Sequence, residues 1–231
     1  MLERLSSSYH LTRHDQRGNG LSDWDVHSFS LDHFVQDLEA VVDAAGLRRF
    51  ALYGTSQGAA IAIAYAACHP DRVSHLVLHG GYPRGRLLRA SDAEREQGSA
   101  ILTLIRHGWG KQGSPFIRAF ATMFIPGGTP EQLNSLAELQ LRTTSPENAA
   151  RIRAAIDTFD VRDTLPKIRV PTLVFHARED GIQPLDQGRE LAEGIPGAEF
   201  VLLESPNHVL LPQEPAWLDF FSRLETFLAD S

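Results

Sequence analysis

The 231-residue sequence has a single cysteine, Cys68, and no apolar run long enough to span a membrane. One cysteine cannot form an internal disulfide, and no Cys/His spacing predicts a metal site. Cys68 lies in an alanine-rich run, so we expect it to pack as a small core residue. The N-terminus also lacks the apolar stretch of a signal peptide, so we expect a cytoplasmic protein with no membrane contact.

Positive charge is also scarce, with 22 Lys and Arg against 29 Asp and Glu and a net charge of −7. A nucleic-acid surface needs a basic face to neutralise phosphates, so this balance argues against nucleic acid as a partner. The densest basic patch, Arg84, Arg86 and Arg89, is soon followed by acidic residues. This mixture favours a solvated surface for the patch.

Apolar segments alternate with helical patterns at both ends of the chain. We expect strands at 9–15, 49–54, 73–81, 172–177 and 198–204, and helices at 30–46, 57–68, 186–194 and 214–230. Ser30 is the expected N-cap of the first of these helices. Alternating strands and helices indicate an α/β fold in which helices flank a mostly parallel sheet.

The middle of the chain, residues 83–165, has helical patterns and no convincing strand. Thr129 and Ser145 are expected N-caps, and each precedes a proline at the first helical position. We expect an α/β core at 1–82 and 166–231, with residues 83–165 inserted as a helical lid.

The sequence Gly-x-Ser-x-Gly at positions 54–58 lies between an expected strand and an expected helix. This setting is typical of a nucleophile elbow, which would place Ser56 at the top of the sheet beside a helix N-terminus. Gly54 and Gly58 would leave room for the sharp turn and for close packing of the helix on the strand. The alternative is a small-residue turn with no catalytic role, since the motif alone has low specificity.

A serine hydroxyl needs a base to take its proton. His208 follows the last expected strand and Asp180 follows the strand before it. We expect His208 to act as general base and then acid, and Asp180 to orient it. The alternatives are a turn-capping role for His208, and a turn role for Asp180, which has Glu179 as its neighbour. No cofactor or metal is needed for this chemistry.

The stretches "DQRGNGLSDW", "YGTSQGAAIAIAYAACHPDRVSHLVLHGG", "PTLVFHAREDGIQP" and "ESPNHVLLPQEP" resemble the α/β-hydrolase family. The resemblance covers about two thirds of the chain. Residue 56 is Ser, whereas the dehalogenases and epoxide hydrolases of this family carry Asp at the corresponding position. "HPDRVSHLVLHGGYPRGR" and "TTSPENAARI" are similar to a bacterial subgroup often attached to signalling modules, which implies an upstream regulatory domain as a fusion partner.

Members of this family normally have three strands before the one expected at 9–15, and the loop after the third donates a backbone N–H to the oxyanion hole. No such segment precedes residue 9, so the N–H of Gln57 would remain as the oxyanion donor. Losing one donor costs about 10²–10³ in rate. We therefore expect an N-terminally truncated fold, a piece of a longer protein, and weak catalysis. We also expect the strand at 9–15 to pair directly with the strand at 49–54, unless another segment lies between them in the sheet.

The resulting hypothesis is a serine hydrolase that cleaves a small apolar ester or related acyl substrate. Trp109 and Phe124 in the expected lid are candidates for the acyl pocket. The alternative is a ligand-sensing or regulatory module that keeps the fold without catalysis. An exposed strand edge would also invite a homodimer.

Overall fold

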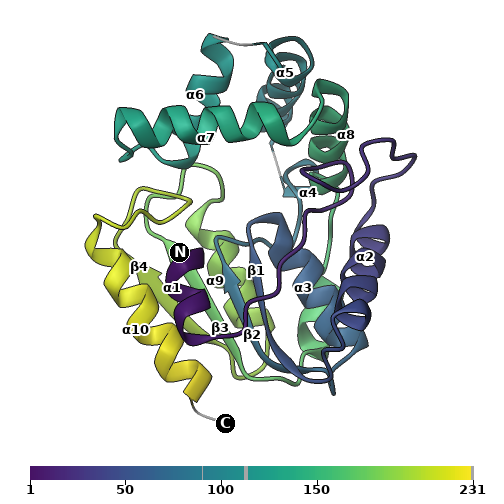
Figure 1. Ribbon diagram of the computed structural model, residues 1–231, viewed down its shortest axis with the longest axis vertical. Helices are drawn as coiled ribbons and strands as arrows, with labels where there is room; N and C mark the ends of the chain where they lie inside the picture. Colours follow the sequence, from purple (N-terminus) through teal and green to yellow (C-terminus); the bar gives the residue numbers. More distant parts are fainter. Residues whose placement is uncertain (90, 112–113, 230–231) are drawn as a thin grey trace.

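The computed structural model describes residues 1–89, 91–111 and 114–229. Its centre is a four-stranded sheet with the order β1-β2-β3-β4 (Figure 1). The strands are β1 (Phe50–Thr55), β2 (Val73–His79), β3 (Thr172–Ala177) and β4 (Glu199–Leu203). All three pairings are parallel, so the carboxyl ends of the strands meet at one edge of the sheet. The α/β class and four of the five expected strands are confirmed.

Helices cover both faces of this sheet because each strand is apolar on both sides. In β2, Leu76 and Leu78 pack with one face, whereas Val77 packs with the other. The first face carries α2 (Leu31–Ala44), α3 (Gln57–Cys68), α9 (Leu185–Gly194) and the 3₁₀ helix η1 (Arg162–Lys167). The second face carries α1 (Leu2–Ser8) and α10 (Pro215–Ala229). The expected helices are confirmed, although residue 230 lies outside the described part.

The helices described between residues 86 and 156 lie above the carboxyl edge of the sheet (Figure 1). They are α4 (Arg86–Arg89), α5 (Asp92–Gly108), α6 (Pro115–Phe124), α7 (Pro130–Thr143) and α8 (Pro146–Ile156). Thr129 caps α7 in a capping box, and the Ser145 hydroxyl accepts the Asn148 N–H at 3.1 Å, as the sequence predicts. These helices have their own apolar cluster around Trp109 and Phe120. The division into a core and a lid stays a prediction, and "lid" below denotes residues 83–165.

The prediction of a strand at residues 9–15 is wrong. This segment is a loop between α1 and α2, and the side chains of Tyr9 and Leu11 are each 38% exposed. A strand needs a partner, but within the described residues β1 pairs with β2 alone. A cavity of about 340 Å³, lined partly by Tyr9 and Ala51, lies beside β1. The expected pairing of 9–15 with 49–54 is therefore not formed.

The expected burial of Cys68 is also wrong, because this residue is exposed at the end of α3. The buried face of that helix is formed by alanines, isoleucines and Tyr65. Within the described residues, no helix is both long and apolar enough to cross a membrane. The same residues contain no group of three His, Cys, Asp or Glu side chains arranged to hold a metal ion.

Candidate active site

Ser56 occupies a sharp turn between β1 and α3. Its backbone has φ +53° and ψ −124°, and among the described residues it is the sole non-glycine residue with positive φ. Such a conformation costs about 1–3 kcal/mol and is typical of functional turns. Its N–H donates to the His79 carbonyl at 2.9 Å, which ties the turn to the end of β2.

The two glycines of the motif have different roles. A Cβ on Gly54 would lie 2.5 Å from the carbonyl oxygen of Gly58 and 2.8 Å from the Ala62 Cβ. Gly54 therefore allows α3 to pack directly on β1, as the sequence predicts. A Cβ on Gly58 would meet no atom within 4 Å, so the expectation of close packing is wrong for Gly58.

Asp180 and His208 form a buried pair in the loops that follow β3 and β4. The His208 Nδ1 lies 2.6 Å from the Asp180 Oδ2, and both side chains are almost fully buried. The Asp180 Oδ1 accepts the backbone N–H groups of Ile182 and Gln183 at 2.8 and 2.9 Å. Burial acts to raise the pKa of Asp180, but the hydrogen bond and charge of His208 together with the two N–H groups outweigh it. The pKa of Asp180 therefore lies below its ordinary value, so the carboxylate stays ionised beside His208.

The two glycines after β2 connect this pair to Ser56. A Cβ on Gly80 would lie 3.0 Å from the His208 Cε1, and one on Gly81 would lie 3.7 Å from the Ser56 carbonyl oxygen. The imidazole and the elbow thus share the carboxyl end of β2. The Nε2 of His208 is buried and has no hydrogen-bond partner among the described residues, Ser56 included.

The lid holds the His208 loop in place. The Phe124 carbonyl accepts the N–H groups of His208 and Val209 at 2.9 and 3.3 Å, and its ring meets the imidazole edge-on at a centroid distance of 5.6 Å. Asn207 accepts the Gly127 N–H at 2.8 Å and donates to Glu214 at 3.0 Å. Sequence patterns gave no sign of this bracing, because its members are far apart in the chain.

Two further histidines lie behind the pair. His79 is buried and its Nδ1 lies 2.9 Å from the Tyr53 hydroxyl, and burial lowers the pKa of His79 to about 3. The His176 Nε2 donates to the Gln183 carbonyl at 3.0 Å, and burial lowers the pKa of His176 as well. Both rings are therefore neutral at pH 7.

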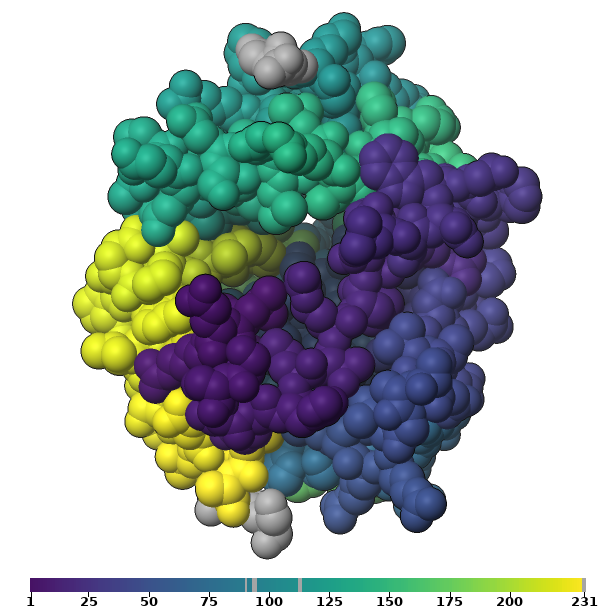
Figure 2. All heavy atoms as spheres, in the orientation of Figure 1, coloured from purple at the N-terminus to yellow at the C-terminus, as the bar shows by residue number. Residues whose placement is uncertain are grey.

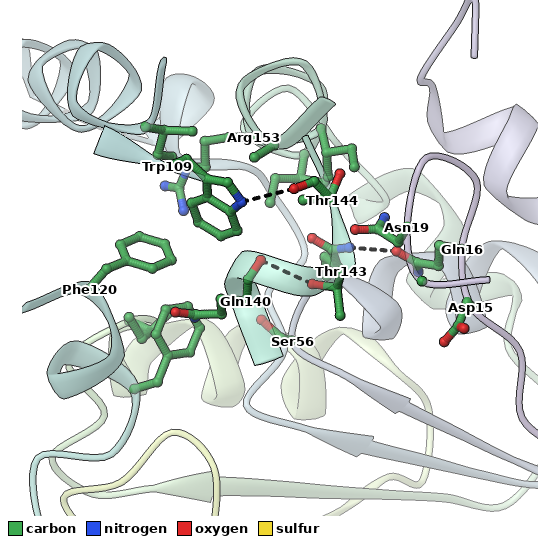
Figure 3. Close-up of a pocket in the computed structure, with 18 of the residues that line it drawn as sticks. Asp15, Gln16, Asn19, Ser56, Trp109, Phe120, Gln140, Thr143, Thr144 and Arg153 are labelled. Atoms are coloured by element: carbon green, nitrogen blue, oxygen red, sulfur yellow. Dashed lines mark hydrogen bonds between the residues drawn. The ribbon is translucent and has the colours of Figure 1, made fainter. Parts of the chain in front are cut away.

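A cavity of about 340 Å³ opens beside Ser56, under the lid. Figure 2 shows the surface hollowed between the lid and the N-terminal segment. Ser56, Gln57, Trp109 and Phe124 all line the cavity. The Phe120 ring lies beside Trp109 (Figure 3) and contacts both lid aromatics, at centroid distances of 5.7 Å from Trp109 and 5.1 Å from Phe124. The N–H of Gln57 is the first of α3 and donates to no acceptor in the described residues.

The cavity also has polar walls, which the sequence patterns did not predict. Gln16 accepts a hydrogen bond from the Gln57 side chain at 2.7 Å, and Gln140, Arg153 and Gln183 line other parts of the wall. The sequence patterns did not indicate that these residues share a cavity, because only the fold brings them together.

Comparisons with known proteins agree with this architecture. The chain matches the model of the alpha/beta hydrolase fold over residues 1–215. It is 31% identical to the AB hydrolase superfamily protein YisY of Bacillus subtilis, covering 84% of this chain and 72% of that protein. It is 27% identical to the pimeloyl-[acyl-carrier protein] methyl ester esterase of Nitrosomonas europaea, covering 90% and 81%.

Solved structures give the same fold. The hydrolase olei00960 from Oleispira antarctica superimposes with a TM-score of 0.82 at 22% identity, over 100% of this chain and 85% of that one. With the family match covering most of the sequence, and with relatives that are themselves hydrolases, the chain belongs to the alpha/beta hydrolase family.

Proposed function

We propose that the protein is a serine hydrolase that cleaves a small ester or related acyl compound through an acyl-enzyme. His208 Nε2 takes the hydroxyl proton of Ser56 as Oγ attacks the acyl carbon, and then gives that proton to the departing alcohol. Water, deprotonated by the same nitrogen, releases the acid and restores Ser56. Asp180 holds the imidazole and stabilises its cationic form.

The observation that carries this proposal is the buried Asp180–His208 pair at 2.6 Å beside a strained serine turn. The free N–H of Gln57, at the N-terminus of α3, would donate to the oxyanion. The apolar lid wall, which includes Trp109 and Phe124, would contact the acyl chain. The relative from Nitrosomonas europaea bears the name of an ester esterase, which supports an ester as substrate.

A fluorophosphonate probe tests the nucleophile, because it forms a covalent adduct only with an activated serine. We expect labelling of the wild type and none of Ser56→Ala, with a parallel loss of p-nitrophenyl butyrate hydrolysis. Ser99→Ala is the matched control, since Ser99 lies on the exposed surface of α5. Labelling that persists in Ser56→Ala would refute the proposal.

One observation favours a second candidate, a ligand-sensing module without catalysis. The His208 Nε2 makes no hydrogen bond to Ser56 in this structure, although a cavity large enough for a small ligand adjoins the Ser56 turn. Fluorophosphonate labelling separates the two candidates. A folded wild-type protein that takes up no label, yet is stabilised against heat by short-chain fatty acids, supports the sensor.

A further inference from the structure

The wall of the cavity has a basic section next to its aromatic one. Arg153 and Gln183 line the cavity, and in Figure 3 Arg153 lies beside Trp109 and away from Ser56. An acyl chain that reaches from Ser56 along the aromatic wall would meet this section. A purely apolar substrate would leave the polar groups of Arg153 and Gln183 without hydrogen-bond partners, which costs binding free energy.

Only part of the Arg153 guanidinium forms hydrogen bonds or ion pairs with the described residues. Its Nε and Nη2 each lie 3.0 Å from a different oxygen of Asp157, the C-cap residue of α8. Its remaining nitrogen, Nη1, donates to no described residue. Because Arg153 lines the cavity, Nη1 remains available to a ligand.

Gln183 is held in one orientation by a second arginine. Arg89 Nη2 donates to the Gln183 Oε1 at 2.7 Å, so the Gln183 amide group must present its N–H donors on the other side. The Gln183 Nε2 has no partner among the described residues. Arg153 and Gln183 both line the cavity, and Arg89, which bonds Gln183, is close enough to Arg153 for the two charges to interact.

The charge of Arg89 is poorly compensated. Its guanidinium lies 5.6 Å from the ring centroid of Tyr82, its Nη1 is buried without a partner, and among the described residues it forms no ion pair. The expected solvated position is therefore wrong for Arg89. Burial, followed by the charge of Arg86, lowers the pKa of Arg89. A nearby anion would stabilise such a partly buried cation.

The carboxylates around the cavity do not cancel this charge. Among the described residues, Asp157 is the carboxylate that offsets the charge of Arg89, and Asp157 already pairs with Arg153. Asp15 also lines the cavity, but it accepts the Leu21 N–H at 3.0 Å in the loop before α2. In Figure 3 Asp15 lies on the opposite side from Arg153.

We propose that Arg153 and Gln183 bind a carboxylate at the far end of the acyl chain, so that the substrates are half-esters of dicarboxylic acids. The inference rests on the proposed function, which puts the ester carbonyl at Ser56. Guanidinium and amide N–H groups match the geometry of a carboxylate, and Arg89 adds a favourable charge behind them.

Binding tests the subsite without catalysis. In the Ser56→Ala variant, calorimetry would compare monoethyl adipate with diethyl adipate, which differ by the free carboxylate. We expect the monoanion to bind at least about tenfold tighter, with an advantage that shrinks as salt rises. Equal affinities, or tighter binding of the diester, would overturn the proposal.

Variants locate the effect. Gln183→Glu puts a negative charge where the ligand carboxylate would sit, and we expect it to remove the preference for the monoanion. Arg153→Met combined with Asp157→Leu removes the buried pair together and should do the same. Arg84→Gln is the matched control, because Arg84 lies near Glu190 outside the cavity wall and should keep the preference. Circular dichroism checks that each variant folds.

Hydrolysis of the same esters separates the two proposals. If the wild type cleaves both esters but neither binds better, the carboxylate subsite is wrong and the hydrolase proposal stands. If it cleaves neither, the proposed function fails, and the binding comparison still decides the subsite.

Discussion

The backbone carbonyl of Phe124, at the end of lid helix α6, accepts the N–H of His208 at 2.9 Å. The same residue packs its ring against the imidazole. The lid therefore does more than cover the cavity, since it fixes the loop that carries the proposed base.

Phe124→Ala keeps this backbone tether but removes the ring contact. We expect kcat for p-nitrophenyl butyrate to fall by roughly 10–100-fold, because small displacements of a catalytic group are costly. Phe116→Ala is the control, since Phe116 packs within the lid cluster and does not line the cavity. Equal losses of kcat in both variants would show that kcat depends on the stability of the lid and not on the contact between Phe124 and His208.

Glu214 is the common acceptor of the His208 loop. It accepts hydrogen bonds from the Ser205 hydroxyl, the Asn207 amide and the Leu211 N–H. Glu214→Ala would leave three donors without a partner, and we expect a loss of about 2–4 kcal/mol in the free energy of unfolding. Urea denaturation measures this change.

Glu214→Gln keeps one acceptor oxygen and nearly the same shape, so its loss should be clearly smaller than that of the alanine variant. Similar losses in the two variants would mean that side-chain packing, rather than hydrogen bonding, accounts for the role of Glu214.

The two glycines of the elbow give a second matched pair. Gly54→Ala would force β1 and α3 apart, because its Cβ would overlap the Gly58 carbonyl and Ala62. We expect it to lose about 1–3 kcal/mol of unfolding free energy. Gly58→Ala meets open space in the first turn of α3 and should be neutral or stabilising by up to about 1 kcal/mol.

Thermal unfolding of both variants tests the pair. A Gly58→Ala protein as unstable as Gly54→Ala would contradict the packing seen around the elbow.

Local sequence patterns predicted most of the sheet and helices, because apolar periodicity and caps act over a few residues. Ser30, Thr129 and Ser145 cap helices as expected. The prediction of a strand at residues 9–15 was wrong. Alternation of apolar and polar residues favours an extended segment, but it does not indicate whether a neighbouring strand is present to pair with it.

The candidate site shows the same limit. The Gly-x-Ser-x-Gly turn and the loops after β3 and β4 pointed to Ser56, Asp180 and His208 because parallel strands bring their carboxyl ends together. No pattern pointed to Arg153 or Gln183 as ligand-binding residues. Their proposed role depends on how α4, which carries Arg89, and α8, which carries Arg153, pack near the loop after β3, and periodicity does not specify this packing.

The lowered pKa of His79 predicts how the free energy of unfolding depends on pH. Its pKa is about 3 in the folded protein, against an ordinary value of 6.5. Between these values the unfolded chain holds a proton that the folded protein does not, so the free energy of unfolding falls as pH falls. One such proton contributes a slope of about 1.4 kcal/mol per pH unit between pH 6 and 4. The stabilising contribution is fully present only above pH 6.5.

His79→Gln removes this proton while keeping a side chain able to bond the Tyr53 hydroxyl. Urea denaturation at pH 6, 5 and 4 should therefore give a slope smaller than that of the wild type by about one proton. The lowered pKa values of His176 and, at the acid end of this range, of Asp180 act in the same direction, but both groups stay in both proteins and cancel in the comparison. The exposed His10 supplies the control, and His10→Gln should keep the wild-type slope. An unchanged slope in His79→Gln would mean that His79 becomes protonated within the fold, which its burial beside Phe175 and Phe220 opposes.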